Sequence, residues 1–555
     1  MSLQKRTNWI IPKKKSTDVL ESITLNRDIK DVDKYISPSL EDIPSFKKLF
    51  GCTKAAKRII KAIEKEQKIL IHGDFDADGI CATSLLWEFL YRDVSKFLKK
   101  KIDVIPYIPS RIDQGYGLTE SSLEDIRGLG CKLLITVDCG VRDRKLIEKY
   151  KDIDFVITDH HQPPKESFED IKYILVHQML GDSKFPYQEI SGSAVIYLVI
   201  QAIANILQMD RKVEKGLDLV ALSTVTDIMP LLGVNRVFVK YGLEEIRKRN
   251  RLGLNALILR SGILPKDVDS YHLGYIIGPR INAAGRIGNP LNAVRLLVSH
   301  DEKQCKEISE ELNTLNFDRQ KLTMDVLEEA KEDVNIKDKL IFVNGRDWHE
   351  GIIGLVAGKL QEEYYKPTIV VSNVKGSARS IQGFNITKTL EKFSKYLERY
   401  GGHELAAGFT IKEGKLDEFK KDIIKYANEK LEKDIQRDIK IDLFLESDQI
   451  GVDLIKELGD LEPYGFGNPK PIIYLDNLVV VKKKVMGQDG KHMKLTVKGG
   501  GIDLLELVMF NCNDDVEKIN EDTSIDVIGY PDINVWNGRE NIQFIVREWR
   551  LNSAN

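Results

Sequence analysis

The sequence has few of the features that tie a chain to a membrane or to a disulfide-stabilised fold. Its six cysteines are scattered with no CxxC pair, so neither a zinc ribbon nor a disulfide framework is indicated. No run of about 18 apolar residues occurs, and the basic N-terminus lacks the apolar core of a signal peptide. We therefore expect reduced cysteines, a cytoplasmic location and no contact with a membrane.

An excess of charge of one sign is also missing. Lys and Arg number 83 against 85 Asp and Glu, so the net charge of -2 argues neither for nor against a nucleic-acid partner. Any basic surface must therefore be local. The 555 residues, 42% of them hydrophobic, are enough for about three domains with cores of their own.

Alternating apolar runs and helical stretches predict an α/β fold for the first half of the chain. The runs KILIHG, IDVIPYIP, KLLITVDCG, DFVITDHH and KYILVH are typical of a parallel sheet covered on both faces. A helical region follows and ends in a long charged amphipathic stretch without Pro or Gly. A second α/β pattern begins at KLIFVNG, and after PYGFGNP short strands with turn signals predict an OB-like β-barrel. The predicted divisions are an N-terminal extension (1–45), the parallel-sheet domain (46–240), the helical region with its connecting helix (241–335), a second, smaller α/β domain (336–435) and the barrel (436–555).

Three aspartates stand at alternate positions after the first predicted strand. Asp74, Asp76 and Asp78 precede a glycine and a helical segment, so their carboxylates converge near a strand end and a helix N-terminus. Repulsion among them would raise their pKa values unless cations compensate. Taken alone, the three residues are explained equally well as a solvated loop with helix caps.

Further polar side chains follow other predicted strands. Asp138 ends one strand, Asp159-His160-His161 ends another, and Asp227 follows a further apolar segment. The carboxyl ends of the strands are where open α/β sheets bind ligands. These oxygen and imidazole groups suffice for two divalent ions that share a bridging carboxylate, and ligation without thiolate suits Mn²⁺ or Mg²⁺. Two such ions can activate a water and stabilise the leaving oxygen of a phosphodiester.

The order of these motifs resembles that of a known family. GDFDADG, VDCG, TDHH and the later Asp227 match, in order, four motifs of the DHH phosphoesterases. GPRINAAGR (278–286), WHEGIIG (348–354), KGSARSIQG (375–383) and GGHELAAGF (401–409) are similar to segments of the single-strand-specific exonucleases of the RecJ family. The resemblance covers roughly residues 50 to 550.

The resemblance implies a set of metal ligands. They would be Asp74, Asp76, Asp78, Asp138, Asp159, His160 and Asp227, with Asp138 as the bridge and Asp159 either a ligand or a support for one. The implied catalytic set is Asp76, Asp138, His160 and His161, with His161 contacting the scissile phosphate. His72 remains an alternative to Asp74 for the first ion.

The resemblance also implies a pocket for a terminal 5′-phosphate. Its residues would be Arg111, Ser377, Arg379, Gly401, Gly402 and His403. GGH is interpreted as a glycine-rich turn whose backbone N–H groups approach a phosphate, and without the resemblance an ordinary turn would be preferred. Arg280 would contact the strand backbone or the interdomain surface, although a surface ion pair explains Arg111 or Arg280 alone equally well.

The C-terminal segment combines lysines with aromatic residues. Basic residues and exposed rings on a small barrel fit an OB-fold that tracks a single strand and stacks its bases. A lysine run can also be a solvated edge, and the tryptophans can belong to a core. The residues concerned are Lys482, Lys483, Lys484, Lys491, Lys494 and Lys498, with Tyr530, Trp536 and Trp549.

The resemblance implies a metal-dependent 5′→3′ exonuclease that degrades single-stranded DNA to nucleoside 5′-monophosphates in recombination and repair. Two divalent cations are expected, Mn²⁺ or else Mg²⁺, together with a monomeric state and, by resemblance, a helicase and a single-strand-binding protein as partners. The alternatives are a DHH phosphodiesterase for short oligoribonucleotides or cyclic dinucleotides, and a non-catalytic single-strand-binding replication scaffold. One departure concerns Val176-His177-Gln178, which stands where an Asn-Pro pair is expected. The extra C-terminal domain of longer relatives is expected to be absent.

Overall fold

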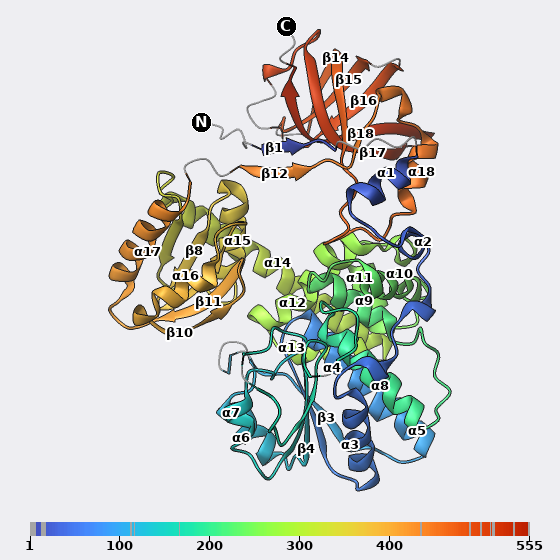
Figure 1. The fold of residues 1–555 in the computed structure, drawn as a ribbon, viewed down its shortest axis with the longest axis vertical. Helices are drawn as coiled ribbons and strands as arrows, with labels where there is room; N and C mark the ends of the chain where they lie inside the picture. The colour runs from blue at the N-terminus through green and yellow to red at the C-terminus, as the bar shows by residue number, and fades with distance from the viewer. Residues whose placement is uncertain are drawn as a thin grey trace. The chain divides into compact units, whose positions relative to one another are not determined.

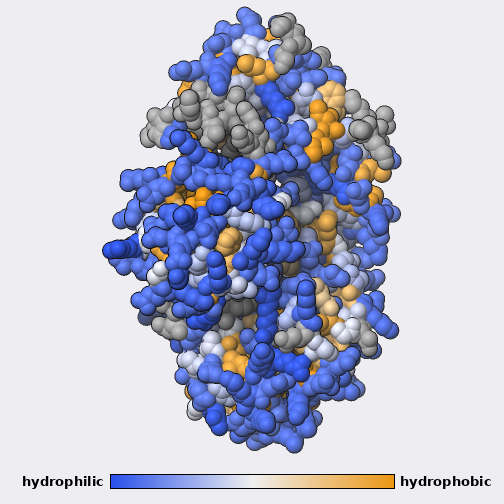
Figure 2. Space-filling model, turned by 60° about the vertical axis from the view of Figure 1, so that its left-hand side comes forward, coloured by the Kyte–Doolittle hydropathy of each residue, from blue (hydrophilic) through white to orange (hydrophobic). Residues whose placement is uncertain are grey.

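The computed structural model (Figure 1) describes residues 7–12, 18–110, 114–115, 117–165, 167–181, 183–432, 436–487, 490–499, 502–510, 512, 517–536 and 539–552. It divides into two compact units, one of Leu40–Ile435 and one of Met1–Ser39 with Gln436–Asn555. None of the helices described is long and apolar enough to cross a membrane. The face shown in Figure 2 is mostly hydrophilic, with its apolar side chains in small separate areas.

The five strands predicted first form one parallel sheet in the order β3-β2-β4-β5-β6. Successive side chains of β2 and β4 are buried on both faces, which explains their continuous apolar sequences. One face packs with α3 and α8, and the other with α6 and α7. The bounds are β2 (Ile69–Gly73), β3 (Val104–Tyr107), β4 (Leu133–Val137), β5 (Asp154–Thr158), β6 (Ile174–Val176), α3 (Cys52–Glu64), α6 (Glu120–Gly128), α7 (Arg144–Ile147) and α8 (Gly192–Ile206).

A helical array completes this part of the unit. The predicted connecting helix is confirmed as α14 (Glu302–Glu332), whose N-terminus is capped by the Asp301 side chain accepting from the Gln304 amide. The other helices are α4 (Ala77–Glu88), the π-helical turn η3 (Phe89–Val94), α5 (Ser95–Leu98), α9 (Leu217–Thr226), α10 (Gly233–Arg247), α11 (Leu252–Arg260), the π-helical turn η5 (His272–Ile277), α12 (Gly278–Ile287) and α13 (Pro290–Val298).

The second α/β region is a mixed five-stranded sheet in the order β10-β11-β9-β8-β7, in which only β7 and β8 run parallel. The segment interpreted as a GGH turn differs from that prediction. Gly401 and Gly402 end strand β10 and pair with β11, so only His403 of the three lies in the connection. The bounds are β7 (Ile341–Gly345), α15 (Ile353–Tyr364), β8 (Thr368–Ser372), β9 (Lys375–Arg379), α16 (Ile386–Lys392), β10 (Leu397–Gly402), β11 (Ala406–Ile411) and α17 (Leu416–Lys430).

The C-terminal unit is a five-stranded barrel, as predicted. Its strands follow the order β14-β15-β16-β18-β17, and pairing of β14 with β17 closes it. The bounds are β12 (Arg437–Lys440), β13 (Leu443–Phe444), α18 (Val452–Gly459), β14 (Ile473–Met486), β15 (His492–Gly499), β16 (Ile502–Met509), β17 (Ser524–Trp536) and β18 (Arg539–Leu551).

The N-terminal segment is part of the barrel unit. Strand β1 (Thr7–Ile10) pairs in parallel with β12, and α1 (Val19–Asn26) and α2 (Val32–Ile36) follow it. Arg27 forms an ion pair of 2.7 Å with Asp442 and donates to the Asn468 side chain at 2.7 Å. This compact unit ends at Ser39, and the boundary predicted at residue 45 remains a prediction. The finer divisions at residues 240 and 335 remain predictions.

Candidate functional site

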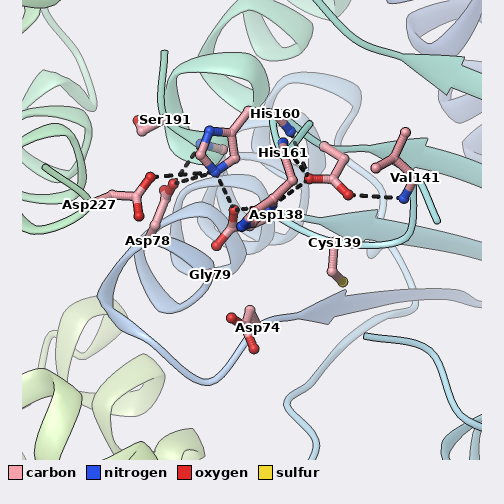
Figure 3. Close-up of polar contacts among 12 residues, drawn as sticks. Asp74, Asp78, Gly79, Asp138, Cys139, Val141, His160, His161, Ser191 and Asp227 are labelled. Carbon is pink, nitrogen blue, oxygen red and sulfur yellow. Dashed lines mark hydrogen bonds and ion pairs between the residues drawn. The ribbon is translucent and has the colours of Figure 1, made fainter. Parts of the chain in front are cut away.

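The polar residues predicted at strand ends converge at one edge of the parallel sheet (Figure 3). Asp74 follows β2, Asp138 follows β4, and Asp159 follows β5. The side chain of Asp76 caps the N-terminus of α4, where it accepts from the Asp78 and Gly79 amides, and Asp227 stands at the C-terminus of α9. Strand ends and two helix termini thus deliver all of these side chains to one place.

Three overlapping groups of side chains have the spacing of metal ligands. In each group the potential ligand atoms lie within 4.8 Å of one another, and Asp138 and His160 each belong to two groups. Nε2 of His160 lies 3.0 Å from Oδ1 of Asp138 and 3.4 Å from Oδ2 of Asp227 (Figure 3). The groups are Asp138–His160–His161, Asp78–His160–Asp227 and Asp74–Asp76–Asp138.

Without a cation, the burial of these carboxylates and the repulsion among them destabilise their charged forms. Burial, and then the charge of Asp78, raise the pKa of Asp76, Asp138 and Asp227. Three buried atoms also have no hydrogen-bond partner among the described residues: Oδ1 of Asp138, Nε2 of His160 and Oδ2 of Asp227. A cation would satisfy these atoms and offset the carboxylate charge, so the donor set fits divalent ions.

Asp78 is held by helix α8 and by two serines that the sequence analysis did not single out. Its Oδ2 accepts from the Gly192 amide at 2.6 Å. Its Oδ1 accepts from the Ser193 amide and hydroxyl, both at 2.8 Å, and from the Ser223 hydroxyl at 2.7 Å. A Cβ at Gly192 would lie 2.7 Å from that of Asp138, so only glycine allows this approach. In the sequence, the Ser-Gly-Ser run at the start of an apolar helical segment is the pattern that could have indicated this support for Asp78.

Asp159 orients the two histidines that follow it. One oxygen accepts from the His160 and His161 amides at 2.7 and 3.0 Å and contacts Nδ1 of His161 at 2.8 Å, and the other accepts from the Val141 amide at 2.9 Å. Although burial opposes the effect, the hydrogen bond to His161 and the charge of that residue keep the pKa of Asp159 low. Among the described residues Asp159 belongs to none of the three groups, and its ligand role stays a prediction.

The pKa values of His160 and His161 are shifted in opposite directions. Burial, and then the charge of His161, lower the pKa of His160 to about 4, so its imidazole is neutral and able to bind a metal near neutral pH. Burial opposes protonation of His161 as well, but Asp159 raises the pKa of His161 overall.

His72 is fully buried at the end of β2, and burial lowers its pKa to about 4. Its Nδ1 lies 3.6 Å from the Cys139 thiol, and its ring stacks on Tyr107. Within the described part of the chain Asp74 belongs to a metal-ligand group and His72 does not. This geometry favours Asp74 for the first ion.

The residues that replace the expected Asn-Pro pair support the histidine loop. Nδ1 of His177 accepts from the Met179 amide, so the ring proton is on Nε2, which donates to the His161 carbonyl at 2.8 Å. The Gln178 side chain donates to the His160 carbonyl at 3.0 Å. Both contacts hold the backbone of the histidine pair in place. The local sequence gives no sign of these contacts.

The GPRINAAGR segment forms α12 and supports the metal loop. The Asn282 side chain accepts from the Ala77 amide at 2.8 Å, and a Cβ at Gly285 would lie 2.1 Å from the Phe75 carbonyl oxygen. Arg286 donates to the Gly351 carbonyl at 3.0 Å, in the segment before α15. Helix α12 therefore links the aspartate loop to the second α/β region.

Residues predicted to bind a phosphate meet on the second sheet. In register across three strands stand Ser377 of β9, Gly408 of β11 and Gly401 of β10. Arg379 lies two residues after Ser377 and so on the same face of β9. A Cβ at Gly354, in the first turn of α15, would lie 2.9 Å from the Ser377 hydroxyl. A guanidinium, a hydroxyl and a helix N-terminus thus lie together, a combination suited to an anion.

His403 and Arg111 were also predicted to bind the phosphate. Burial, and then the charges of Arg142 and His161, lower the pKa of His403, which places His403 in the electrostatic reach of the metal cluster. Arg111 lies outside the described residues.

The lysines predicted to bind nucleic acid are only in part available on the barrel. Lys482 and Lys484 are exposed, whereas Lys483 donates to the Ile519 carbonyl at 2.7 Å. Lys494 pairs with Glu506. The Trp536 side chain lies outside the described residues, and Trp549 packs partly buried against the core.

Comparisons with known families cover most of the chain. The DHH family N-terminal domain matches residues 68–224, the DHHA1 domain matches 337–429, and the RecJ OB domain matches 441–548. These three regions correspond to the parallel sheet, the mixed sheet and the barrel.

Individual proteins match over almost the full length. The single-stranded-DNA-specific exonuclease RecJ of Bacillus subtilis is 34% identical over 97% of this chain and 68% of its own, and that of Haemophilus influenzae is 30% identical over 94% and 92%. The crystal structure of RecJ from Thermus thermophilus with Mn²⁺ has a TM-score of 0.84 and 27% identity, covering 100% of this chain and 81% of that one. The same protein with Mg²⁺ has a TM-score of 0.79 and 26% identity, covering 99% and 79%. The convergent carboxylates, the barrel and these matches together show that the chain belongs to the RecJ family.

Proposed function

We propose that the chain is a metal-dependent 5′→3′ exonuclease that degrades single-stranded DNA to nucleoside 5′-monophosphates in recombination and repair. The observation that carries the proposal is the convergence of Asp138, His160 and Asp227, whose buried ligand atoms have no other partner among the described residues. Family membership supports the substrate, because the curated relatives are described as single-stranded-DNA-specific exonucleases.

Two divalent cations fit the three groups of ligands. Asp74 and Asp76 would hold one ion, His160 and Asp227 with Asp78 the other, and Asp138 would be shared. Divalent ions, when bound, polarise a phosphoryl oxygen and make a water nucleophilic. We expect Mn²⁺ to be preferred over Mg²⁺, and both occur in structures of the Thermus thermophilus relative.

The chain's own residues orient the substrate around this centre. Asp159 holds Nδ1 of His161 and raises its pKa, so a protonated His161 would donate to an oxygen of the scissile phosphate. Asp78 would stay fixed in place because the Gly192 amide and three N–H or O–H groups of Ser193 and Ser223 hold its two oxygens.

The polarity would be set by the pocket on the second sheet. Ser377, Arg379, His403 and the first turn of α15 would bind the terminal 5′-phosphate, so that only the first phosphodiester reaches the ions. A 3′ end carries no such phosphate. A helicase and a single-strand-binding protein are proposed partners on family grounds, and the protein is proposed to act as a monomer.

The alternatives are less well supported. A phosphodiesterase for dinucleotides would not need the barrel that matches the RecJ OB domain over residues 441–548. A non-catalytic scaffold would not need a complete and electrostatically costly set of ligands.

A nuclease assay with Mn²⁺ tests the proposal. End-labelled long single strands, duplexes and dinucleotides would be incubated with the wild-type protein and with Asp138→Ala. We expect mononucleotides from the 5′ end of single strands only, and none from the variant. Cleavage confined to dinucleotides would sink the proposal, and intact metal binding without any cleavage would favour a scaffold.

A further inference from the structure

Two arginines outside the metal cluster, on the packed helices α12 and α14, have no acidic partner among the described residues. Arg280 on α12 donates from Nε to the Asn313 side chain at 3.0 Å and from Nη1 to the Ile276 carbonyl at 2.7 Å. Arg319 on α14 donates from Nη2 to the Asn316 side chain at 2.9 Å. Asn313 and Asn316 are one helical turn apart, which brings the two guanidiniums together on one face of α14.

The partners of these arginines orient them without cancelling their charge. Helix α14 is rich in glutamate, yet the residues that meet the guanidiniums are asparagines. Among the described residues neither arginine has a carboxylate within ion-pair distance, and the Arg319 Nε is buried without a hydrogen-bond partner. Two like charges held together by neutral amides remain available to an anion from outside.

Electrostatics agree with this geometry. Burial lowers the pKa of Arg280, and burial followed by the charge of Arg280 lowers the pKa of Arg319. The two cations therefore repel each other in the absence of an anion. A phosphate between them would relieve that repulsion, and guanidinium geometry matches phosphate oxygens.

Exposed aromatic rings lie next to the anchoring residues. Tyr275 precedes Ile276, is 73% exposed and stacks on Tyr271 with ring centroids 4.9 Å apart. Phe317 lies one helical turn after Asn313, the residue that accepts from Arg280, and is 64% exposed. Cations combined with exposed rings are typical of surfaces that bind a single-stranded nucleic acid, because every base has a face that can stack.

The arginine pair is also tied to the metal loop. Asn282, two residues after Arg280 on α12, accepts from the Ala77 amide in the loop that carries the aspartates. A strand contacting Arg280 would therefore lie on the same rigid helix that supports the metal centre.

We propose that Arg280 and Arg319 form a clamp for internucleotide phosphates of the single strand, with Tyr275 and Phe317 as stacking faces for its bases. This inference rests on the proposed function, which it deepens by assigning Arg319, Tyr275 and Phe317 to the strand's path. The competing explanation is that the arginines only join α12 to α14.

Salt dependence of binding distinguishes the two explanations. A 5′-phosphorylated, 3′-fluorescent single strand of about 20 nucleotides, longer than the site of one OB fold, would be titrated by anisotropy with metal-free protein. Affinity would be measured between about 50 and 200 mM salt. For Arg319→Gln and for Arg280→Gln we expect the slope of log affinity against log salt to become shallower by about 0.7 each, the value for one single-strand phosphate contact.

Three variants control the measurement. Arg319→Lys keeps the charge, so its slope should return to that of the wild type. Lys57→Gln removes an equal charge from an exposed position of α3, which takes no part in the proposed clamp, and should leave slope and affinity unchanged. Phe317→Ala should weaken binding about fivefold or more without changing the slope.

An Arg319→Gln variant with the wild-type slope and an unchanged melting temperature would overturn the clamp. Unchanged affinity of Phe317→Ala would overturn the stacking role. A separate measurement tests the proposed function itself. If that function is wrong, wild-type protein with Mn²⁺ will leave the same labelled strand intact.

Discussion

Asp138 lies within the electrostatic reach of Asp78, Asp76, Asp227 and Asp74, and its φ of 65° is in the left-handed region. Asp and Asn tolerate that region better than most residues, so asparagine can replace this aspartate without added backbone strain. The residue thus combines a conformational and an electrostatic cost at the centre of the site.

Asp138→Asn tests that cost. We expect the variant, without metal and at pH 7, to melt at a higher temperature than the wild type, because one buried negative charge is removed. The variant should lose the stabilisation by Mn²⁺, which for a single site is about 2.7 kcal/mol at a hundredfold excess over Kd. Differential scanning fluorimetry with EDTA or Mn²⁺ measures both effects. The exposed Asp170→Asn is the control, and a lower melting temperature without metal would contradict the prediction.

The same carboxylates predict how stability varies with pH. A carboxyl whose pKa is higher in the folded than in the unfolded state contributes stability that is fully present below the unfolded value, about 3.9 for Asp, and is lost as the pH rises through the folded value. Burial raises the pKa of Asp138 and Asp227 well above the ordinary value. Buried His72 and His160, whose lowered pKa acts in the opposite sense, change little above about pH 7.5. From about pH 7.5 to 9 the metal-free protein should therefore become less stable to urea, as measured by chemical denaturation. Saturating Mn²⁺ should remove most of this trend, and a trend unaltered by Mn²⁺ would disprove the assignment.

Ser223 is expected to matter through Asp78. Ser223→Ala removes a 2.7 Å hydrogen bond to a buried carboxylate, worth about 1.5 to 3 kcal/mol. Loss of such support for a metal ligand typically lowers metal affinity about 10- to 100-fold. Isothermal titration with Mn²⁺ measures the change. Ser84→Ala is the matched control, because its buried hydroxyl bonds only the Ile80 carbonyl, and equal affinities of the two variants would refute the role.

At the level of elements, helix α12 and the aspartate loop require close backbone approach. Gly285 meets the Phe75 carbonyl, and Asn282 meets the Ala77 amide. Neither contact is local in sequence, and both place a helix of the array against the loop that follows β2.

Gly285→Ala should displace that loop, because the added methyl would lie 2.1 Å from the Phe75 oxygen. We expect weaker Mn²⁺ binding and weaker nuclease activity, measured by titration and by the single-strand assay. Gly358→Ala in α15 is the control, since its methyl meets no heavy atom within 4 Å and should stabilise the helix by about 0.5 to 1 kcal/mol. If Gly285→Ala binds Mn²⁺ with the affinity of the wild type, the loop adapts to the added methyl and the prediction is wrong.

At the level of the whole molecule, the N-terminal segment folds with the C-terminal barrel and not with the sequence that follows it. Ile23 and Tyr35 are buried in the barrel unit's core, and β1 adds to β12. The predicted metal ligands all belong to the other unit.

Truncation at both ends should therefore leave the metal centre working. A chain of residues 40–432 is expected to fold and to keep its stabilisation by Mn²⁺, while binding single strands more weakly because the barrel is gone. A chain of residues 1–432 should aggregate, because the apolar side of α1 loses its cover. Melting curves with Mn²⁺ and light scattering measure these outcomes, and loss of Mn²⁺ stabilisation in the shorter chain would contradict the prediction.

The sequence by itself determined the parallel sheet, the connecting helix, the second α/β region, the barrel and the residues that meet at the metal cluster. Each βα unit places its polar residues at the carboxyl end of a strand, so the positions of Asp74, Asp138 and His160 follow from local patterns. Only the tertiary structure decided which groups hold them. Ser193 and Ser223 reach Asp78 from other helices, His177 and Gln178 reach the histidine loop, and the N-terminal strand β1 pairs with β12, which precedes the barrel. Such contacts join residues that are distant along the chain. The periodicity of a sequence indicates which face of a helix or strand a residue lies on, but it does not identify the residue that packs against it.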